Sequence, residues 1–295
     1  METATQERIR ARAAPRGALG KLIATLPVKQ RRFTLNGVVT SVLEGGAGTP
    51  IVLLHGPGGY GAQWVRVIPE MSKSHRVIAP DLPGHGTSEF FSDAPTPERV
   101  SAWLDDLIEC TCSQPPVLVG HTLGGAIAAR FAAESDRKLA ALVLVDMLGL
   151  SAFQPQPAFG AALQSYLQKP DETTHDGLWS QCLFDLDGAK RRLGEPWAWI
   201  KEANLEIVRE TGVGPMTAWM QQFGVAIPDE LLRRIRTRTT LIWGREDRAT
   251  PLSVAQAAAP RYAWNLEVID GAADDPTLEQ PEAFVSALRR AIEVS

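Results

Sequence analysis

Short apolar runs recur along most of the chain and are separated by stretches with the spacing of amphipathic helices. Continuous apolar runs of this length are typical of strands that are buried on both faces of a sheet. The alternation predicts an α/β fold, a mostly parallel, doubly wound sheet with its ligand crevice at the carboxyl ends of the strands. The runs are Ile51–Leu54, Arg76–Ala79, Val117–Val119, Leu139–Val145, Thr239–Trp243 and Leu266–Ile269.

The beginning of the chain has a different pattern. Residues 1–30 are rich in Arg and Ala but contain Pro15, Gly17 and Gly20, so we expect an N-terminal helical extension that is frayed or docked on the surface. Arg32–Leu35 and Val38–Leu43 follow as strands. The Asn-Gly pair between them is a strong signal for a two-residue hairpin turn.

The strand–helix alternation stops at about residue 150 and resumes at about residue 233. The segment between them has mainly helical spacing and contains four of the eight Trp residues. This pattern predicts an inserted helical cap at 150–232, with the α/β core formed by 31–149 and 233–295.

Composition and charge narrow the function classes. With 295 residues, 44% of them hydrophobic, the chain is long enough for one large domain with an insertion. The net charge of −4 provides no basic surface for nucleic acid, and no apolar run approaches the roughly 20 residues of a membrane helix. Three Cys cannot all pair, which favours a reduced, cytoplasmic setting. The expected partner is a small, largely apolar substrate; a homodimer is left open.

The most informative segment is the turn after Val117–Val119. It reads Gly120-His121-Thr122-Leu123-Gly124 and leads into a helix of small residues. A Cβ on either flanking glycine would clash where strand and helix meet. The segment therefore predicts a strand–turn–helix that holds Thr122 on a sharp corner at the carboxyl end of a strand.

This segment resembles the nucleophile elbow of the α/β-hydrolase family. Four other segments match that family in the same order along the chain, which implies the α/β-hydrolase fold. The resemblance also implies a catalytic acid at Asp247 and an oxyanion donor at the N–H of Leu123. The four segments are His55-Gly56, Asp81–Gly86, Trp243–Asp247 and Gly271–Pro276 with the Glu279-Gln280-Pro281 that follows it.

The catalytic machinery departs from the family at three places. The elbow carries Thr122 where the family usually has Ser. The loop that supplies the family's histidine reads Gly-Ala-Ala-Asp-Asp-Pro, so Asp274 falls at the imidazole position. The second oxyanion donor would come from Pro57, which has no N–H, so we expect Gly58 or its neighbour Gly59 to replace it. The sequence therefore predicts an enzyme without a standard Ser-His-Asp triad.

These substitutions bring two carboxyl groups to converging loops. We expect Asp247 and Asp274 to lie within hydrogen-bonding distance and to share a proton beside the Thr122 hydroxyl. Such a trio suits non-hydrolytic acid/base chemistry, as in a lyase, cyclase or dehydratase. One alternative is a hydrolase of esters or C–C bonds that recruits His55, His175 or a substrate group as its base. Another is a catalytically inactive ligand-binding pseudo-hydrolase.

The substrate is expected between the elbow and the cap, in a mainly apolar crevice. His55 and His121 belong to the turns that face this crevice, and the aromatic residues of the cap are candidates for its roof. A competing interpretation is that these rings form the cap's own core. No cofactor and no metal site is predicted. The roof candidates are Trp179, Trp199, Trp219 and Phe223, together with Trp197.

Overall fold

A single sheet organises the computed structural model, which describes residues 17–212 and 214–293. The eight strands lie in the order β1-β2-β4-β3-β5-β6-β7-β8. The β1–β2 and β2–β4 pairs are antiparallel and the other five pairs are parallel. The predicted fold class is thus confirmed. The strands are β1 (Lys29–Leu35), β2 (Val38–Gly45), β3 (Thr49–Leu54), β4 (His75–Pro80), β5 (Val117–His121), β6 (Ala141–Val145), β7 (Thr239–Gly244) and β8 (Asn265–Ile269).

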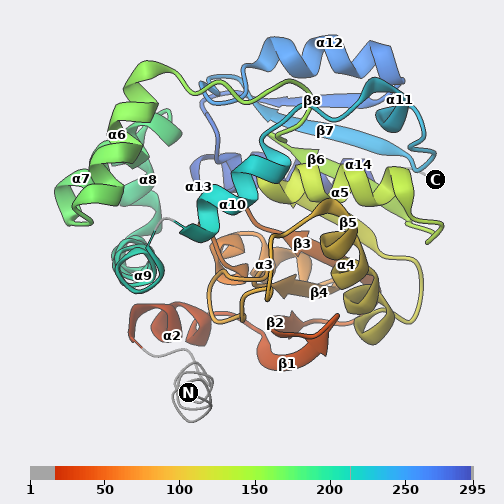
Figure 1. Cartoon of the computed structure of the whole chain (residues 1–295), viewed down its shortest axis with the longest axis horizontal. Helices are drawn as coiled ribbons and strands as arrows, with labels where there is room; N and C mark the ends of the chain where they lie inside the picture. Colours follow the sequence, from red (N-terminus) through yellow and green to blue (C-terminus); the bar gives the residue numbers. More distant parts are fainter. Residues whose placement is uncertain (1–16, 213, 294–295) are drawn as a thin grey trace.

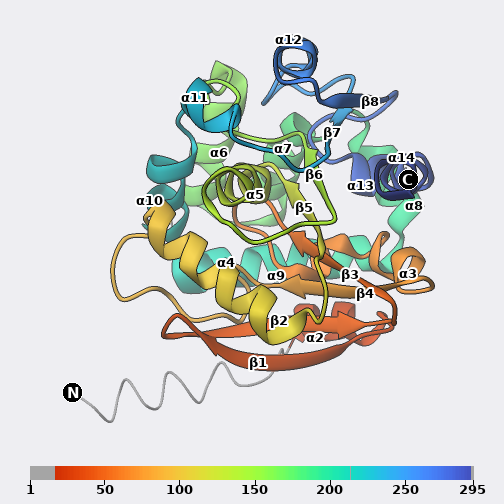
Figure 2. The same cartoon turned by 90° about the vertical axis from the view of Figure 1, so that its right-hand side faces the viewer.

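Helices cover both faces of this sheet (Figure 2). Successive strand residues point to opposite faces, so in β3 Ile51 and Leu53 join one apolar core, and Val52 and Leu54 join the other. The core helices are α3 (Ile68–Met71), α4 (Pro97–Thr111), α5 (Leu123–Glu134), α12 (Leu252–Tyr262), α13 (Pro276–Glu279) and α14 (Pro281–Glu293), with a 3₁₀ turn at Gly61–Trp64.

The predicted hairpin joins β1 and β2. Leu35 pairs with Val38, and both turn residues have positive φ, 45° for Asn36 and 79° for Gly37. The strand begins at Lys29, earlier than the pattern suggested. Its first residues are polar because β1 is an edge strand, and Arg31 forms an ion pair with Glu44 across the hairpin.

Helix α2 (Gly17–Ala24) precedes the sheet and packs against helix α9 (Glu195–Thr211; Figure 1). It buries Ala18, Leu19 and Leu22. The part of the expected helical extension before Gly17 lies outside the described residues.

The described residues between β6 and β7 form six helices. Helices α6 to α9 stack beside the sheet, while α10 and α11 contact α5 of the core (Figure 1). No helix within 17–212 or 214–293 is long and apolar enough to cross a membrane. The six are α6 (Pro157–Gln168), α7 (Glu172–Cys182), α8 (Leu186–Leu193), α9 (Glu195–Thr211), α10 (Gly214–Phe223) and α11 (Asp229–Leu232).

Candidate functional site

A cavity of about 560 Å³ lies between the carboxyl ends of the strands and helices α6, α7, α9 and α10. We call its strand-end side the floor, and it includes Gly56–Gly58, His121, Thr122, Asp274 and Asp275. The opposite wall comes from the inserted helices and is mainly apolar, as the sequence predicts. Its residues are Phe159, Leu163, Tyr166, Leu167, Leu178, Trp179, Cys182, Asn204, Val208, Met216, Thr217, Met220 and Gln221.

The turn between β5 and α5 forms the sharp corner predicted from the sequence. Thr122 has φ 46° and ψ −103°, a backbone conformation that β-branched residues rarely adopt. Its N–H donates to the Val145 carbonyl at 2.9 Å, which ties the corner to β6. A Cβ on Gly124 would come within 2.3 Å of the Leu54 carbonyl oxygen, so only glycine allows this close packing.

The Thr122 hydroxyl is buried and, within the described chain, has no hydrogen-bond partner. It lies against Gly56, where an added Cβ would be only 2.5 Å from the hydroxyl oxygen. A buried hydroxyl without a partner has lost its hydration without compensation. The hydroxyl is therefore available to a molecule that enters the cavity.

Two backbone N–H groups near Thr122 remain candidates for binding an oxyanion. Leu123 is the first residue of α5, so its N–H has no acceptor within the helix. The N–H of Gly59 donates to the Gly56 carbonyl at 3.2 Å and closes the preceding turn. Gly58 lines the cavity, and it is the remaining substitute for Pro57.

Asp247 is satisfied by its own loop. Its carboxylate accepts hydrogen bonds from the N–H groups of Ala249 at 2.7 Å and Thr250 at 3.0 Å, and from the Thr250 hydroxyl. Burial raises its pKa, and these hydrogen bonds oppose that shift. The loop after β7 thus turns this acid back onto its own backbone. The hydrogen bond expected between Asp247 and Asp274 stays a prediction.

Asp274 has the opposite environment. Its side chain lines the cavity and, within the described part of the chain, accepts no hydrogen bond. Burial raises the pKa of this carboxyl well above its usual range, and the negative charges of Asp247, Asp275 and Glu279 raise it further. The Asp274 and Asp247 carboxyl groups are thus electrostatically coupled. Asp274 consequently holds a proton under conditions in which an exposed carboxyl is ionised.

The backbone of Asp274 is held from both sides. Its carbonyl accepts a hydrogen bond from His121 Nε2 at 2.6 Å, and its N–H donates to the Cys182 carbonyl at 3.1 Å. His121, predicted to face the crevice, does line the cavity. The contacts fix the Asp274 loop between the elbow and the end of α7.

Glu279 reinforces this arrangement and was not predicted. Its carboxylate accepts from the N–H of Ala273 at 2.7 Å, next to Asp274. It also accepts from the N–H groups of Phe184 at 2.8 Å and Asp185 at 3.0 Å, which lie between α7 and α8. The sequence analysis included Glu279 in a segment that matches the family but gave its side chain no role.

Asp146 is another carboxyl that the sequence analysis did not select. It follows β6 directly, with φ 41°, and its Oδ1 accepts from the Gly244 N–H at 2.8 Å. Its Oδ2 has no partner in the described chain. Burial, followed by the charges of Asp247 and Asp274, raises its pKa well above the usual range. Its position immediately after a buried strand was the signal that could have identified it.

His55 was expected to contact the substrate, and this expectation is wrong. Its Nδ1 donates to the Gly56 carbonyl at 2.7 Å, and its Nε2 accepts from the Leu82 N–H at 2.9 Å. Both ring nitrogens thus hold loops together beneath the cavity.

Within the described residues no group of three or more His, Cys, Asp or Glu side chains is arranged to hold a metal ion.

Of the four aromatic residues that were the main candidates for the roof, Trp179 lines the cavity and the other three do not. Trp219 and Phe223 pack into the core beside α5, and the Trp219 indole donates to the Pro83 carbonyl at 3.1 Å. Trp199 packs against the core on the other face of the sheet, and Trp197 is buried there. These four rings thus pack into the two apolar cores that also contain the strand residues, and not into a separate core of the cap. Helix α10 instead presents Met216 and Met220 to the cavity.

The comparisons with known proteins agree with this fold. The model of the Alpha/beta hydrolase family matches residues 51–287. A 2-hydroxymuconate semialdehyde hydrolase from Pseudomonas sp. (strain CF600) is 30% identical over 78% of this chain and 81% of that protein. A 2-hydroxy-6-oxo-6-(2'-aminophenyl)hexa-2,4-dienoic acid hydrolase from Metapseudomonas resinovorans is 26% identical, over 88% of this chain and 89% of that protein.

Among solved structures, a 2-hydroxy-6-oxo-6-phenylhexa-2,4-dienoate hydrolase from Rhodococcus sp. strain RHA1 superposes with a TM-score of 0.76. It is 23% identical and covers 90% of this chain and 99% of its own, so this likeness concerns the fold. The relatives named here are hydrolases. They favour the hydrolase alternative, and the expectation of a lyase, cyclase or dehydratase finds no support in them.

Proposed function

Because the chain belongs to the alpha/beta hydrolase family, we propose that it is a hydrolase of small molecules that uses the Asp274 carboxyl in place of the family's imidazole. The bond to be cleaved lies next to a carbonyl group and is a C–C or an ester bond. The observation that carries this proposal is the Asp274 carboxyl, without a hydrogen bond and with a raised pKa, in the same cavity as the free Thr122 hydroxyl.

The first step adds water to the substrate carbonyl. The protonated Asp274 carboxyl gives its proton to the carbonyl oxygen, and the resulting carboxylate takes a proton from the attacking water. The N–H groups of Leu123 and Gly58 and the Thr122 hydroxyl bind the oxygen that gains charge. The product is a gem-diol, and Asp274 regains its initial state.

The second step breaks the bond. The Asp274 carboxyl first gives its proton to the departing carbon or oxygen. The resulting carboxylate then takes a proton from a hydroxyl group of the gem-diol. The products are a carboxylic acid and the protonated leaving group, so atoms and charge balance. No covalent enzyme intermediate is needed, which suits Thr122, whose methyl group restricts χ1 and crowds a nucleophilic attack.

The lining of the cavity narrows the substrate class. The two acids named for the relatives above, a dienoic acid and a dienoate, are carboxylates at neutral pH. Among the described lining residues there is no Lys or Arg to pair with such an anion. Asp274 and Asp275 also line the cavity, and each adds a negative charge when its carboxyl group is ionised. An unpaired carboxylate would be costly to bury in this cavity. We therefore expect a neutral substrate.

A panel of neutral substrates tests the proposal. The β-diketone 1-phenylbutane-1,3-dione should be cleaved by hydrolysis, followed as loss of its enol absorbance, and p-nitrophenyl butyrate much more slowly. Asp274→Asn should abolish the cleavage, and a fluorophosphonate probe should leave Thr122 unlabelled. Labelling of Thr122, or full activity of Asp274→Asn, would refute the proposal.

A ligand-binding protein without turnover is a second candidate. It is favoured by Pro57, which removes an oxyanion donor, and a missing donor typically costs about 10²–10³ in rate. Tight binding of the diketone with no cleavage at any pH between 5 and 9 would establish this second candidate instead.

A further inference from the structure

The wall of the cavity opposite the floor contains two buried polar atoms that the proposed chemistry does not use. They are the Tyr166 hydroxyl and the Oδ1 of Asn204, on α6 and α9. Tyr166 is 5% exposed and Asn204 8% exposed, and neither atom has a hydrogen-bond partner in the described chain. Each such atom typically costs about 1–3 kcal/mol of stability when it is left unsatisfied. We call these two residues the cap site.

His175 of α7 connects the two members of the cap site. Its Nε2 lies 3.3 Å from the amide nitrogen of Asn204. Its ring meets that of Tyr166 edge-on, with the ring centroids 5.8 Å apart. Tyr166 and Asn204 therefore both contact one buried imidazole, although 38 positions separate them in the chain.

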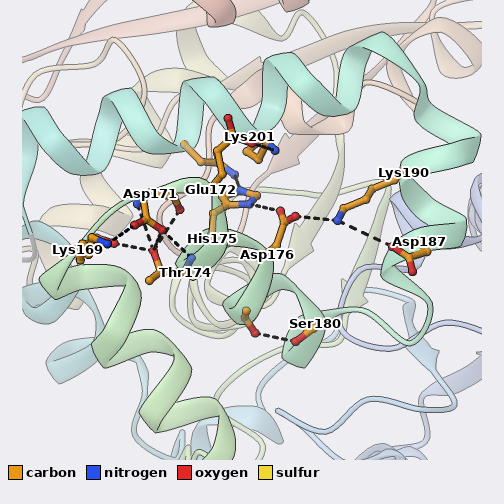
Figure 3. Close-up of polar contacts among 12 residues, drawn as sticks. Lys169, Asp171, Glu172, Thr174, His175, Asp176, Ser180, Asp187, Lys190 and Lys201 are labelled. Atoms are coloured by element: carbon orange, nitrogen blue, oxygen red, sulfur yellow. Dashed lines mark hydrogen bonds and ion pairs between the residues drawn. The ribbon is translucent and has the colours of Figure 1, made fainter.

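The charges around His175 decide which atom of Asn204 is free. His175 Nδ1 is 3.3 Å from an oxygen of Asp176, and the same carboxylate pairs with Lys190 at 2.8 Å (Figure 3). A carboxylate held by a cation is an acceptor, so Nδ1 carries the proton. Burial lowers the pKa of His175 to about 4, so the ring is neutral and Nε2 is an acceptor. Asn204 must then present its NH₂ to the ring, which leaves Oδ1 as the free acceptor.

The Tyr166 hydroxyl complements this acceptor. Burial raises its pKa to about 12, so it keeps its proton and can donate it. The cap site thus offers one donor and one acceptor, and no charge, at the end of an apolar cavity. A group that both donates and accepts one hydrogen bond fits this pair.

We propose that Tyr166 and Asn204 form a recognition site for a neutral hydroxyl group at the end of the substrate that is remote from Thr122. The hydroxyl donates to Asn204 Oδ1 and accepts from the Tyr166 hydroxyl. His175, Asp176 and Lys190 are positioning residues, because they orient the Asn204 amide without facing the ligand. The inference rests on the proposed function only in placing the reactive carbonyl at Thr122.

Three compounds with one skeleton test the inference. They are 4-phenylbutan-2-one and its derivatives with a para-hydroxyl or a para-carboxylate, and their binding to the full chain is measured by titration calorimetry at neutral pH. Two hydrogen bonds to neutral groups should make the hydroxyl compound bind about 10-fold more tightly than the parent. The carboxylate should bind most weakly.

Variants identify the residues responsible. Tyr166→Phe and Asn204→Leu should each remove most of the preference for the hydroxyl compound while leaving the affinity for the parent compound nearly unchanged. Tyr262→Phe is the matched control, because the Tyr262 hydroxyl donates to Asp229 outside the cavity. Any of three results would overturn the inference. The first is equal affinities for the hydroxyl and parent compounds, and the second is an equal loss of affinity for these two compounds in Tyr166→Phe. The third is that none of the three compounds binds.

The readout separates this inference from the proposed function. A hydroxyl preference in a protein that cleaves no substrate would support the cap site and refute the hydrolase. Cleavage of the diketone without any hydroxyl preference would support the hydrolase and refute the cap site.

Discussion

The floor of the cavity and the cap site both contain buried polar atoms without partners, but the two regions differ in charge. At the floor, burial raises the pKa of Asp274, and the negative charges of neighbouring carboxyl groups raise it further. At the cap site, the nearest titratable group, His175, is neutral, and the charge of Asp176 is balanced by Lys190. One region can exchange a proton, and the other can only form hydrogen bonds.

The difference separates two tasks that a substrate cavity must perform. A carboxyl that titrates near the working pH is suited to proton transfer, and a neutral donor–acceptor pair is suited to orientation. The loops after parallel strands place the first, and packing between inserted helices places the second. Four changes should break or sharpen this contrast.

The largest expected effect concerns the floor. Asp274→Asn removes the group that exchanges protons, so hydrolysis of 1-phenylbutane-1,3-dione should fall by about 10²–10⁴ in kcat. Asp275→Asn is the matched control, because the Asp275 carboxylate is engaged by the Thr277 hydroxyl at 2.5 Å, and its loss of rate should be far smaller. Comparable losses in the two variants would show that the acidity of the floor as a whole matters, and not Asp274.

The second change concerns Glu279, which links the Asp274 loop to the segment between α7 and α8. Glu279→Gln puts an amide where three backbone N–H groups now meet one carboxylate, so the free energy of unfolding should fall by about 2–4 kcal/mol. Urea denaturation measures this change. Glu282→Gln alters an exposed residue on the next helix and should change the stability by less than about 0.5 kcal/mol. A negligible effect of Glu279→Gln would mean that the Asp274 loop is held mainly by His121 and Cys182.

The third prediction concerns pH. The raised pKa of Asp274 means that the folded state binds a proton that the unfolded state releases above about pH 4. Stability from this group is therefore fully present below pH 4 and declines as pH rises, by at most about 1.4 kcal/mol per pH unit. Asp274→Asn should gain stability over the unmodified chain progressively from pH 5 to 8. A stability difference that does not vary with pH would contradict the raised pKa.

The smallest expected effect concerns the cap site. Asp176→Leu removes the acceptor that holds the proton on His175 Nδ1, so the preference for the hydroxyl compound should fall from about 10-fold to about 3-fold. Asp176→Asn, which keeps an acceptor oxygen, should restore most of it. Asp187→Leu changes an exposed partner of the same lysine and serves as the control. A preference unchanged in Asp176→Leu would show that Asn204 is oriented without the histidine.

Much of the fold and part of the floor could be predicted from local patterns. The turn at Asn36-Gly37 and the corner at Thr122 follow from short-range sterics, because the residues that make them are adjacent in the chain. The buried strands follow from continuous apolar runs for the same reason. Asp274 could be placed at the floor because its loop resembles the one that carries the family's histidine.

The tertiary structure decided which of these groups are free. Asp247 and Asp274 look equivalent as residues after strands, but only the loop of Asp247 folds back to satisfy its carboxylate. The roles of the cap aromatics depended on which face of each helix meets the core, so Trp179 lines the cavity while Trp219 and Phe223 do not. Tyr166 and Asn204 carry no local signal at all. Their pairing arises because α6, α7 and α9 pack around one imidazole, and contacts between segments so distant in sequence are determined by packing rather than by neighbouring residues.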